Sequence, residues 1–255
     1  MEPIFETSGS LPRPVDVTKA NDYDRFAAGY SAYTDDNIVT AYYARPAIVN
    51  LAGDVTGRRI LDAGCGAGPL AAALRDKGAV VTGIDASAEM LSLARRRLGD
   101  DVTLRVADLG DRLPFADGTF DDVVASLVLH YLEDWGPTLA EMRRVLRPGG
   151  RMIASVHHPF VDYVFRDPRP DYFATTSYTD EWTFNGQAFP MRFWRRPLHA
   201  MTDAFTTAGF RLSVISEPPP DPAARDRFPD DFRELSTKSC FLFFVVEVPC
   251  SGSDG

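Results

Sequence analysis

Short apolar runs alternate with amphipathic stretches through most of the chain. The apolar runs are four to eight residues long and end at acids, glycines or polar residues, which is typical of buried strands. The expected strands are 59–62, 80–84, 102–106, 120–127, 151–156, 210–216 and 241–248. The expected helices between them are 68–77, 87–98, 132–146 and 197–208. Strands that alternate with helices over short connections predict an α/β fold, in which helices cover both faces of a parallel sheet.

Local signals at the ends of these segments support the assignment. Ser87 precedes the second expected helix, where a serine hydroxyl accepts a hydrogen bond from a free backbone N–H, and Glu89 follows in the first turn. The stretch 147–150, read as RPGG, is expected to form a turn before the fifth strand. The proline-rich stretch 217–231 is expected to be a mobile surface loop.

Three regions depart from the alternation of strands and helices. Residues 1–20 are rich in proline and polar residues and are expected to form a flexible tail. Residues 21–51 fit two short helices that carry several tyrosines. Residues 159–196 contain eleven aromatic residues, with prolines that exclude a long helix. The sequence therefore predicts one domain over 21–255 with an aromatic-rich cap insertion at 159–196.

Composition narrows the class of protein. A chain of 255 residues with 45% apolar residues can build one large core. The net charge of −9 argues against nucleic acid or an anionic membrane as the main partner. No apolar run is long enough to span a membrane, and no secretion signal is visible. The three cysteines show no metal-binding spacing and are expected to be free thiols, which favours a cytoplasmic protein without a metal site.

The stretch 60–70, read as ILDAGCGAGPL, combines a strand, a glycine-rich turn and the start of a helix. Glycines permit positive φ angles and a close approach of the backbone to a ligand, and a helix start offers free N–H groups. A dinucleotide-binding turn would carry its third glycine where Pro69 stands. Asp62 inside the strand would repel a pyrophosphate but suits a ligand that carries an ammonium group. Pro69 and Asp62 therefore disfavour NAD(P) as the ligand of this turn.

Further candidate residues follow the next strands. In an open parallel sheet, ligands bind at the carboxyl ends of the strands, near the point where the strand order reverses. Asp85 ends the second strand, 19 residues after Gly66, close to the interval expected for an acid that binds ribose hydroxyls. Asp108 ends the third strand, and Ser126 lies near the end of the fourth. Together with Gly64, they indicate one continuous ligand site along this edge.

These motifs resemble those of class I S-adenosylmethionine (SAM) dependent methyltransferases, in particular the bacterial small-molecule enzymes of methyltransferase type 11. The resemblance rests on LDAGCGAG, GIDAS, VADLGDRLPF, FDDVVASLVLHYLED and VLRPGGRMIAS and covers about residues 55–158. It implies a Rossmann-like, doubly wound sheet of seven strands whose last strand is antiparallel. It also implies SAM as the cofactor, with helices 21–51 as a lid over its pocket.

The resemblance also implies roles for individual residues. Asp62 and Gly64 would contact the methionine moiety of SAM, Gly66 would bind the cofactor in the same turn, and Asp85 would bind the ribose. Asp108 would accept from the adenine amino group, with the backbone N–H of Leu109 on a ring nitrogen. Ala86 and Met90 would form apolar walls around the adenine.

The expected function is methyl transfer to a small aromatic or apolar metabolite, by in-line displacement. His157, His158 and His130 are the candidate bases, since they follow the fourth and fifth strands, and catalysis by alignment alone stays open. The cap insertion, with Trp182 and Phe184, is expected to line the acceptor site. An NAD(P)-dependent oxidoreductase and a non-catalytic SAM-binding protein are the alternatives. Whether the protein forms a homodimer also stays open.

Overall fold

A seven-stranded sheet forms the centre of the computed structural model, which describes residues 20–184 and 186–250. The strands are β1 (Arg59–Ala63), β2 (Val80–Asp85), β3 (Thr103–Val106), β4 (Phe120–Ser126), β5 (Leu146–His157), β8 (Arg211–Ser216) and β9 (Phe241–Glu247). Their order across the sheet is β3-β2-β1-β4-β5-β9-β8. The last strand, β9, lies between β5 and β8 and is antiparallel to both. The predicted seven-stranded doubly wound sheet is confirmed, and the predicted tail at 1–20 lies almost wholly outside the described residues.

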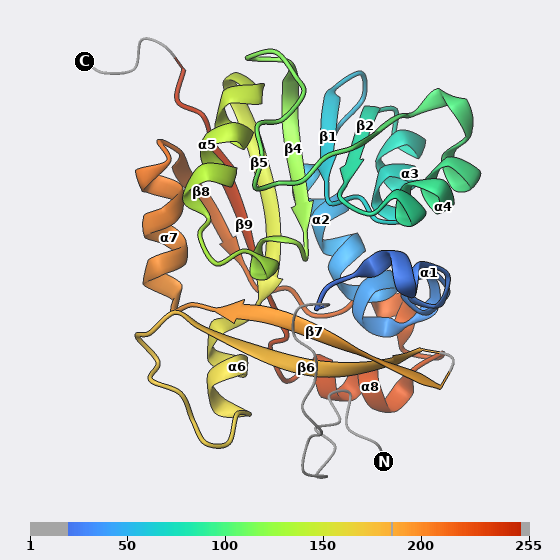
Figure 1. Cartoon of the computed structure of the whole chain (residues 1–255), viewed down its shortest axis with the longest axis vertical. Coiled ribbons are helices and arrows are strands. Elements are labelled where there is room, and N and C mark those ends of the chain that lie inside the picture. The colour runs from blue at the N-terminus through green and yellow to red at the C-terminus, as the bar shows by residue number, and fades with distance from the viewer. Residues whose placement is uncertain (1–19, 185, 251–255) are drawn as a thin grey trace.

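Helices cover both faces of the sheet, as Figure 1 shows. The α-helices are α1 (Ala27–Asp36), α2 (Arg45–Ala52), α3 (Pro69–Asp76), α4 (Ala88–Leu98), α5 (Gly136–Val145), α6 (Pro159–Val164), α7 (Leu198–Thr207) and α8 (Pro229–Leu235). Shorter helical segments are η2 (Tyr23–Arg25), η3 (Thr40–Ala44), η4 (Gly99–Asp101), η5 (Leu129–Tyr131) and η6 (Pro222–Ala224).

Strand alternation divides the apolar residues between two cores. Ile60 packs on one face with Ile48 of α2 and Leu74 of α3. Its neighbour Leu61 packs on the opposite face with Leu139 of α5. Because side chains of successive strand residues point to opposite faces, both must be apolar in a strand covered on both sides. This explains why the central strands are continuous apolar runs.

Three sequence-based boundaries were wrong. Residues 147–150 continue β5 instead of forming a turn, because they pair with the chain beyond β9: Gly149 N–H donates to the Val248 carbonyl, and Val248 N–H to Gly150. The helix expected from 132 begins only at Gly136. Part of the expected loop 217–231 is helical, since η6 lies within it and α8 begins at Pro229, where a proline suits the first turn.

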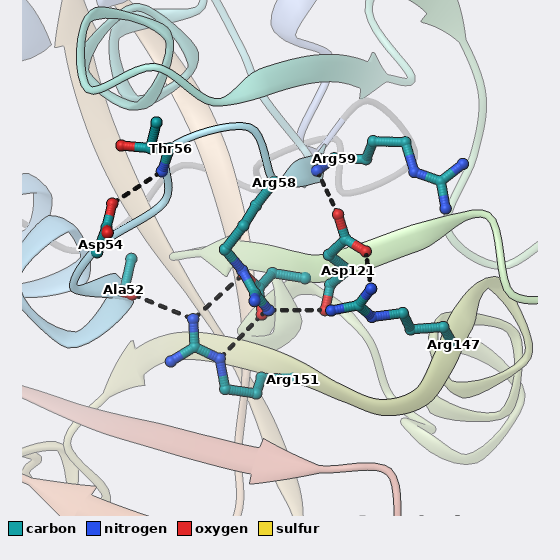
Figure 2. A network of polar contacts seen from close by, with 9 residues as sticks. Ala52, Asp54, Thr56, Arg58, Arg59, Asp121, Arg147 and Arg151 are labelled. Atoms are coloured by element: carbon teal, nitrogen blue, oxygen red, sulfur yellow. Dashed lines mark hydrogen bonds and ion pairs between the residues drawn. The ribbon is translucent and has the colours of Figure 1, made fainter.

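Buried charges tie the strands together at the amino ends of β1 and β4. Arg58 binds the Asp122 carboxylate through two contacts of 2.5 and 2.7 Å, and Arg151 of β5 adds a third at 2.9 Å. Beside it, Asp121 accepts from the Arg59 backbone and pairs with Arg147. Figure 2 shows these arginines converging on the strand ends. Burial of Asp122 opposes its ionisation, but the hydrogen bonds from Arg58 and Arg151 outweigh this and lower its pKa.

A two-stranded hairpin and the N-terminal helices lie across the opposite edge of the sheet (Figure 1). The hairpin strands are β6 (Thr176–Phe184) and β7 (Gln187–Arg195). The Asn21 side chain bonds both the N–H and the carbonyl of Arg192 in β7, so the start of the described chain is fixed to the hairpin. Phe26 packs into the hairpin cluster formed by Phe189, Met191 and Phe193. The carboxyl ends of the strands therefore face a layer made of segments far apart in sequence.

Candidate active site

A cavity of about 320 Å³ lies at the carboxyl ends of β1, β2 and β4. All nine residues predicted to bind the cofactor line it: Asp62, Gly64, Gly66, Asp85, Ala86, Met90, Asp108, Leu109 and Ser126. The cavity lies where the strand order reverses between β1 and β4, the usual ligand position in open α/β sheets. The structure thus brings the whole predicted set together, while the contact that each residue makes stays a prediction.

The glycine-rich turn after β1 shapes one wall of the cavity. Gly64 has φ +76°, and its N–H donates to the Ile84 carbonyl at 2.9 Å, which fixes the turn to β2. A Cβ atom at Gly64 would lie 2.6 Å from a methyl group of Val128. Gly66 has φ +53°, and a Cβ atom there would meet no atom within 4 Å. Gly64 is therefore required by packing, whereas the space beside Gly66 is open for a ligand.

Asp85 both supports this turn and faces the cavity. Its carboxylate accepts from the Gly66 N–H at 2.8 Å and from the Ser87 N–H at 2.9 Å. Burial raises the pKa of Asp85, and these two amide donors oppose the increase. A carboxylate has about four acceptor positions, so two amides leave room for ligand hydroxyls. Ser87 caps α4 by accepting from Met90 N–H, as predicted.

Asp62 is the most unusual group in the cavity wall. The residue is 1% exposed, and its Oδ2 atom is buried without a hydrogen-bond partner among the described residues. Burial raises its pKa to about 7, with a further contribution from the charge of Asp85. A buried carboxylate oxygen without a donor is unfavourable unless a ligand supplies one. The site therefore fits a ligand that presents a cation or a strong donor at this point.

The structure adds cavity residues that were not among the predicted cofactor-binding residues. They are Asn21, Tyr23, Tyr30, Thr34, Thr40, Ala44, Arg45, Cys65, Ala67, Pro69, Leu70, Ala107, Leu127, Val128, Tyr131 and Leu132. The tyrosine-rich composition of 21–51 was the only signal for the first group. The hydroxyls of Tyr23 and Tyr131 lie 2.5 Å apart, although 108 positions separate them. This bond joins the N-terminal segment to η5 above the cavity.

Both the sequence motifs and the fold of this chain match those of known proteins. A family model described as a methyltransferase domain matches residues 61–154. An S-adenosylmethionine-dependent methyltransferase from Mesorhizobium loti superposes with a TM-score of 0.64 and 25% identity, over 79% of this chain and 96% of that one. These matches support a class I SAM-dependent methyltransferase fold for the chain, with residues 61–154 as the matched methyltransferase domain.

Curated relatives match over the same region. The ubiquinone/menaquinone biosynthesis C-methyltransferase UbiE of Desulfotalea psychrophila is 37% identical over 130 residues, 47% of this chain and 52% of that protein. The demethylmenaquinone methyltransferase of Tropheryma whipplei is 35% identical over 135 residues, 50% of this chain and 56% of that protein. The chain thus spans about half the length of these relatives.

The lining of the cavity fits SAM, the cofactor of this family. The unpartnered Oδ2 of Asp62 would accept from the ammonium group of the methionine moiety. Asp85 has acceptor positions left for the ribose hydroxyls, and Ala86, Met90 and Leu109 give apolar surface for adenine. Asp108 accepts from Gly110 N–H at 2.7 Å, which keeps its carboxylate at the rim of the cavity. In the part of the chain that the structure describes, no cluster of metal-ligand side chains occurs.

The three candidate histidines lie outside the lining of this cavity. His130 is buried and stacks on His157 with ring centroids 4.0 Å apart, and burial lowers the pKa of His130 well below its usual value. His157 Nδ1 lies 3.1 Å from the Tyr178 hydroxyl. His158 pairs with Glu217 at 2.8 Å and accepts from Phe160 N–H as the cap of α6. His158 therefore has a structural role, and the catalytic role of the histidines stays a prediction.

The cap insertion does not take part in this cavity, and its role at the acceptor site stays a prediction. None of the described residues of 159–196 is part of its lining. Trp182 instead stacks on Tyr30 with centroids 5.9 Å apart, and Phe184 stacks on Phe26 at 5.3 Å. The aromatic side chains of the hairpin are occupied by packing against the N-terminal segment. Trp182 packs against the ring of Tyr30, and Tyr30 lines the cavity.

Among residues 20–184 and 186–250, no helix combines the length and the apolar character needed to cross a bilayer.

Proposed function

We propose that this protein transfers the methyl group of SAM to a small aromatic or apolar metabolite. The observation that carries the proposal is the cavity itself, which Asp62, with its unpartnered carboxylate oxygen, lines together with the eight other residues predicted to bind the cofactor. A structural aspartate would find its donors within the protein. An aspartate that keeps one unpartnered carboxylate oxygen in the wall of a cavity is suited to a cationic ligand.

The acceptor side of the cavity combines aromatic rings with hydroxyl groups. Tyr23, Tyr30 and Tyr131 line it, and burial raises their pKa values, that of Tyr30 to about 12. Their hydroxyls are therefore protonated at neutral pH and can donate to an acceptor oxygen or nitrogen. The rings give apolar contact area. This wall supports a small, flat acceptor with a limited number of polar atoms.

Alignment is the mechanism that the geometry supports best. The sulfonium of bound SAM supplies an activated methyl group, so the protein needs mainly to orient the acceptor and exclude water. Asp62, the glycine turn and Asp85 would hold the cofactor from the sheet side. The tyrosines would hold the acceptor from the N-terminal layer. None of the three candidate histidines lines the cavity, so we assign no base to the reaction.

Calorimetry with SAM, its product S-adenosylhomocysteine and NAD tests the cofactor. SAM and its product should bind, and NAD should not. Asp62→Asn should weaken both by about 10–100-fold, because the amide loses the charge that meets the ammonium group. Tight binding of NAD in place of SAM would favour the oxidoreductase alternative.

Mass spectrometry with methyl-labelled SAM and a panel of quinones, phenols and heteroaromatic amines tests the transfer. A mass increase of one labelled methyl group in any acceptor establishes the reaction. Binding of SAM without transfer to any member of the panel would favour the non-catalytic alternative. The cytoplasmic location and the homodimer stay predictions, and gel filtration checks the second.

A further inference from the structure

Negative charge exceeds positive charge in the wall of the cavity. Among the described residues that line it, the charged side chains are three carboxylates and one guanidinium: Asp62, Asp85, Asp108 and Arg45. With all four ionised, the wall carries two net negative charges. SAM, with a sulfonium, an ammonium and a carboxylate group, carries one net positive charge. A cavity that holds SAM therefore keeps one net negative charge, which disfavours an anion beside the cofactor and favours a cation.

Proton-accepting side chains are scarce on the acceptor side of the cavity. No histidine or lysine occurs among its described lining residues. Under the proposed function, the three carboxylates are occupied by the ammonium group, the ribose and the adenine of SAM. An acceptor that has to lose a proton would therefore find none of the usual general bases beside it.

Three tyrosines indicate how a phenol would behave on that side. Tyr23, Tyr30 and Tyr131 line the cavity, and the ring of Tyr23 meets the other two edge to face, with centroids 5.0 and 6.0 Å away. Burial raises the pKa of all three, and the charge of Asp85 adds to the increase for Tyr30 and Tyr131. The same surroundings oppose the ionisation of a phenol bound beside them.

An alkyl amine is unsuitable for the opposite reason. It is protonated at neutral pH, and a cavity of net negative charge favours the protonated form further, so the lone pair is not available. A pyridine-type ring nitrogen avoids both difficulties. It is neutral, its lone pair is free, and its methylation creates a cation that the net negative charge of the cavity stabilises.

We infer that the acceptor is a flat heteroaromatic compound that is methylated on a neutral, pyridine-type ring nitrogen. This inference rests on the proposed function and deepens it, because it names the atom that receives the methyl group. The nitrogen lone pair forms the new C–N bond while the S–CH3 bond breaks and leaves its electron pair on sulfur. No proton is transferred. The products are an N-methyl heteroaromatic cation and S-adenosylhomocysteine.

Calorimetry with three bicyclic probes tests the charge preference without turnover. N-methylquinolinium, quinoline and 1-naphthoate differ in charge but little in size. Each is titrated into the protein saturated with S-adenosylhomocysteine. The cation should bind about 10-fold or more tightly than neutral quinoline, and the anion should bind most weakly. Any other order of affinities, or equal affinities, would overturn the inference.

Mass spectrometry with methyl-labelled SAM tests the atom that is methylated. Quinoline should react about 100-fold or more faster than 1-naphthol and 1-naphthylmethylamine, which is the smallest usual contribution of a general base. Its turnover at saturating SAM should stay constant from about pH 7 to about pH 9, since no proton is lost. Faster methylation of 1-naphthol or of the amine would overturn the inference and leave the proposed function standing. Absence of transfer to these probes and to the acceptor panel above would overturn the proposed function, and this inference with it.

Tyr131→His places a base on the acceptor side and should raise the methylation of 1-naphthol by about 10-fold or more. Tyr33→His is the matched control, because Tyr33 is 55% exposed on α1 and does not line the cavity, so it should give no increase. The affinity for S-adenosylhomocysteine checks that both variants fold. An increase in both folded variants, or in neither, would show that phenols are not excluded by the lack of a base and would overturn the inference.

Discussion

Two aspartates in neighbouring strands, Asp62 of β1 and Asp122 of β4, are equally hidden from solvent, at 1% and 0% exposure. Asp122 binds two arginines, and its pKa is lowered. Asp62 has an unpartnered oxygen, and its pKa is raised to about 7. Two aspartate side chains with the same burial thus have pKa shifts of opposite direction. The difference depends on which end of the sheet the carboxylate faces.

This contrast separates a stabilising edge of the sheet from a binding edge. At the amino ends, arginines from β5 and from the residue before β1 satisfy the acids of β4 (Figure 2). At the carboxyl ends, the acids of β1 and β2 keep acceptor positions that the protein does not use. A buried carboxylate left without partners lowers stability, so we interpret Asp62 as a group whose donor comes with the ligand.

The largest expected effect comes from Asp122→Asn. The amide removes the charge that Arg58 and Arg151 share, and breaking a buried pair by changing one partner typically lowers stability by about 3–5 kcal/mol. SAM affinity should be unchanged because the network lies at the far end of the strands. Chemical denaturation and calorimetry measure the two quantities. A loss below 1 kcal/mol would show that the arginines are satisfied without Asp122.

The change of the free energy of unfolding with pH should reveal the contribution of Asp62. Its folded pKa of about 7 lies above the unfolded value of about 3.9. The folded state therefore binds more protons, and the free energy of unfolding should fall as pH rises from 4 to 7, by up to about 4 kcal/mol. Asp62→Asn should remove this part of the slope and be more stable than the wild type at pH 8.

The contribution of Asp122 to stability changes with pH in the opposite direction, which makes it the internal control for that experiment. Its folded pKa is lowered, so its contribution is present above the unfolded value and is lost as pH falls through the folded one. Asp62→Asn should keep this loss of stability in acid. An identical slope from pH 4 to 7 in Asp62→Asn and the wild type would show that Asp62 is not the group that titrates.

Two glycine substitutions sharpen the description of the binding edge. Gly66→Ala should lower stability by about 1–2 kcal/mol through its positive φ alone, because its Cβ meets open space. Gly64→Ala carries the same strain and also a contact of 2.6 Å with Val128, so it should be less stable than Gly66→Ala. Thermal unfolding ranks them. Equal stability would mean that Val128 moves away freely.

The smallest effect is expected at His158, a satisfied polar group at the binding edge. His158→Ala removes the cap of α6 and the contact to Glu217, so stability should fall by about 1 kcal/mol. SAM affinity should remain unchanged, and turnover as well once an acceptor is known. His199→Ala, on the exposed side of α7, is the control. A selective loss of turnover in His158→Ala would restore it as a candidate base.

The sequence by itself determined the fold and the cofactor side of the site. Strand periodicity located β1, β2, β4 and β9, because a strand covered on both faces must be apolar at consecutive positions. The glycine turn and the residues at the strand ends were also readable, since the carboxyl ends of parallel strands meet at one edge. Asp85 and Ser126 lie 41 positions apart but needed only this rule to be placed together.

Only the tertiary structure decided which polar groups find partners. Asp62 precedes the glycine turn and Asp122 follows Asp121, but neither local pattern shows which carboxylate finds a partner within the protein. The difference arises because Arg58, just before β1, and Arg151 of β5 reach Asp122. Arg45 and Tyr131 are likewise brought to the cavity by packing between segments 86 positions apart. Trp182 and Phe184 of the hairpin do not line the cavity and stack instead on Tyr30 and Phe26. Long-range packing sets the partners of a side chain, whereas its period along the chain sets only the face on which it lies.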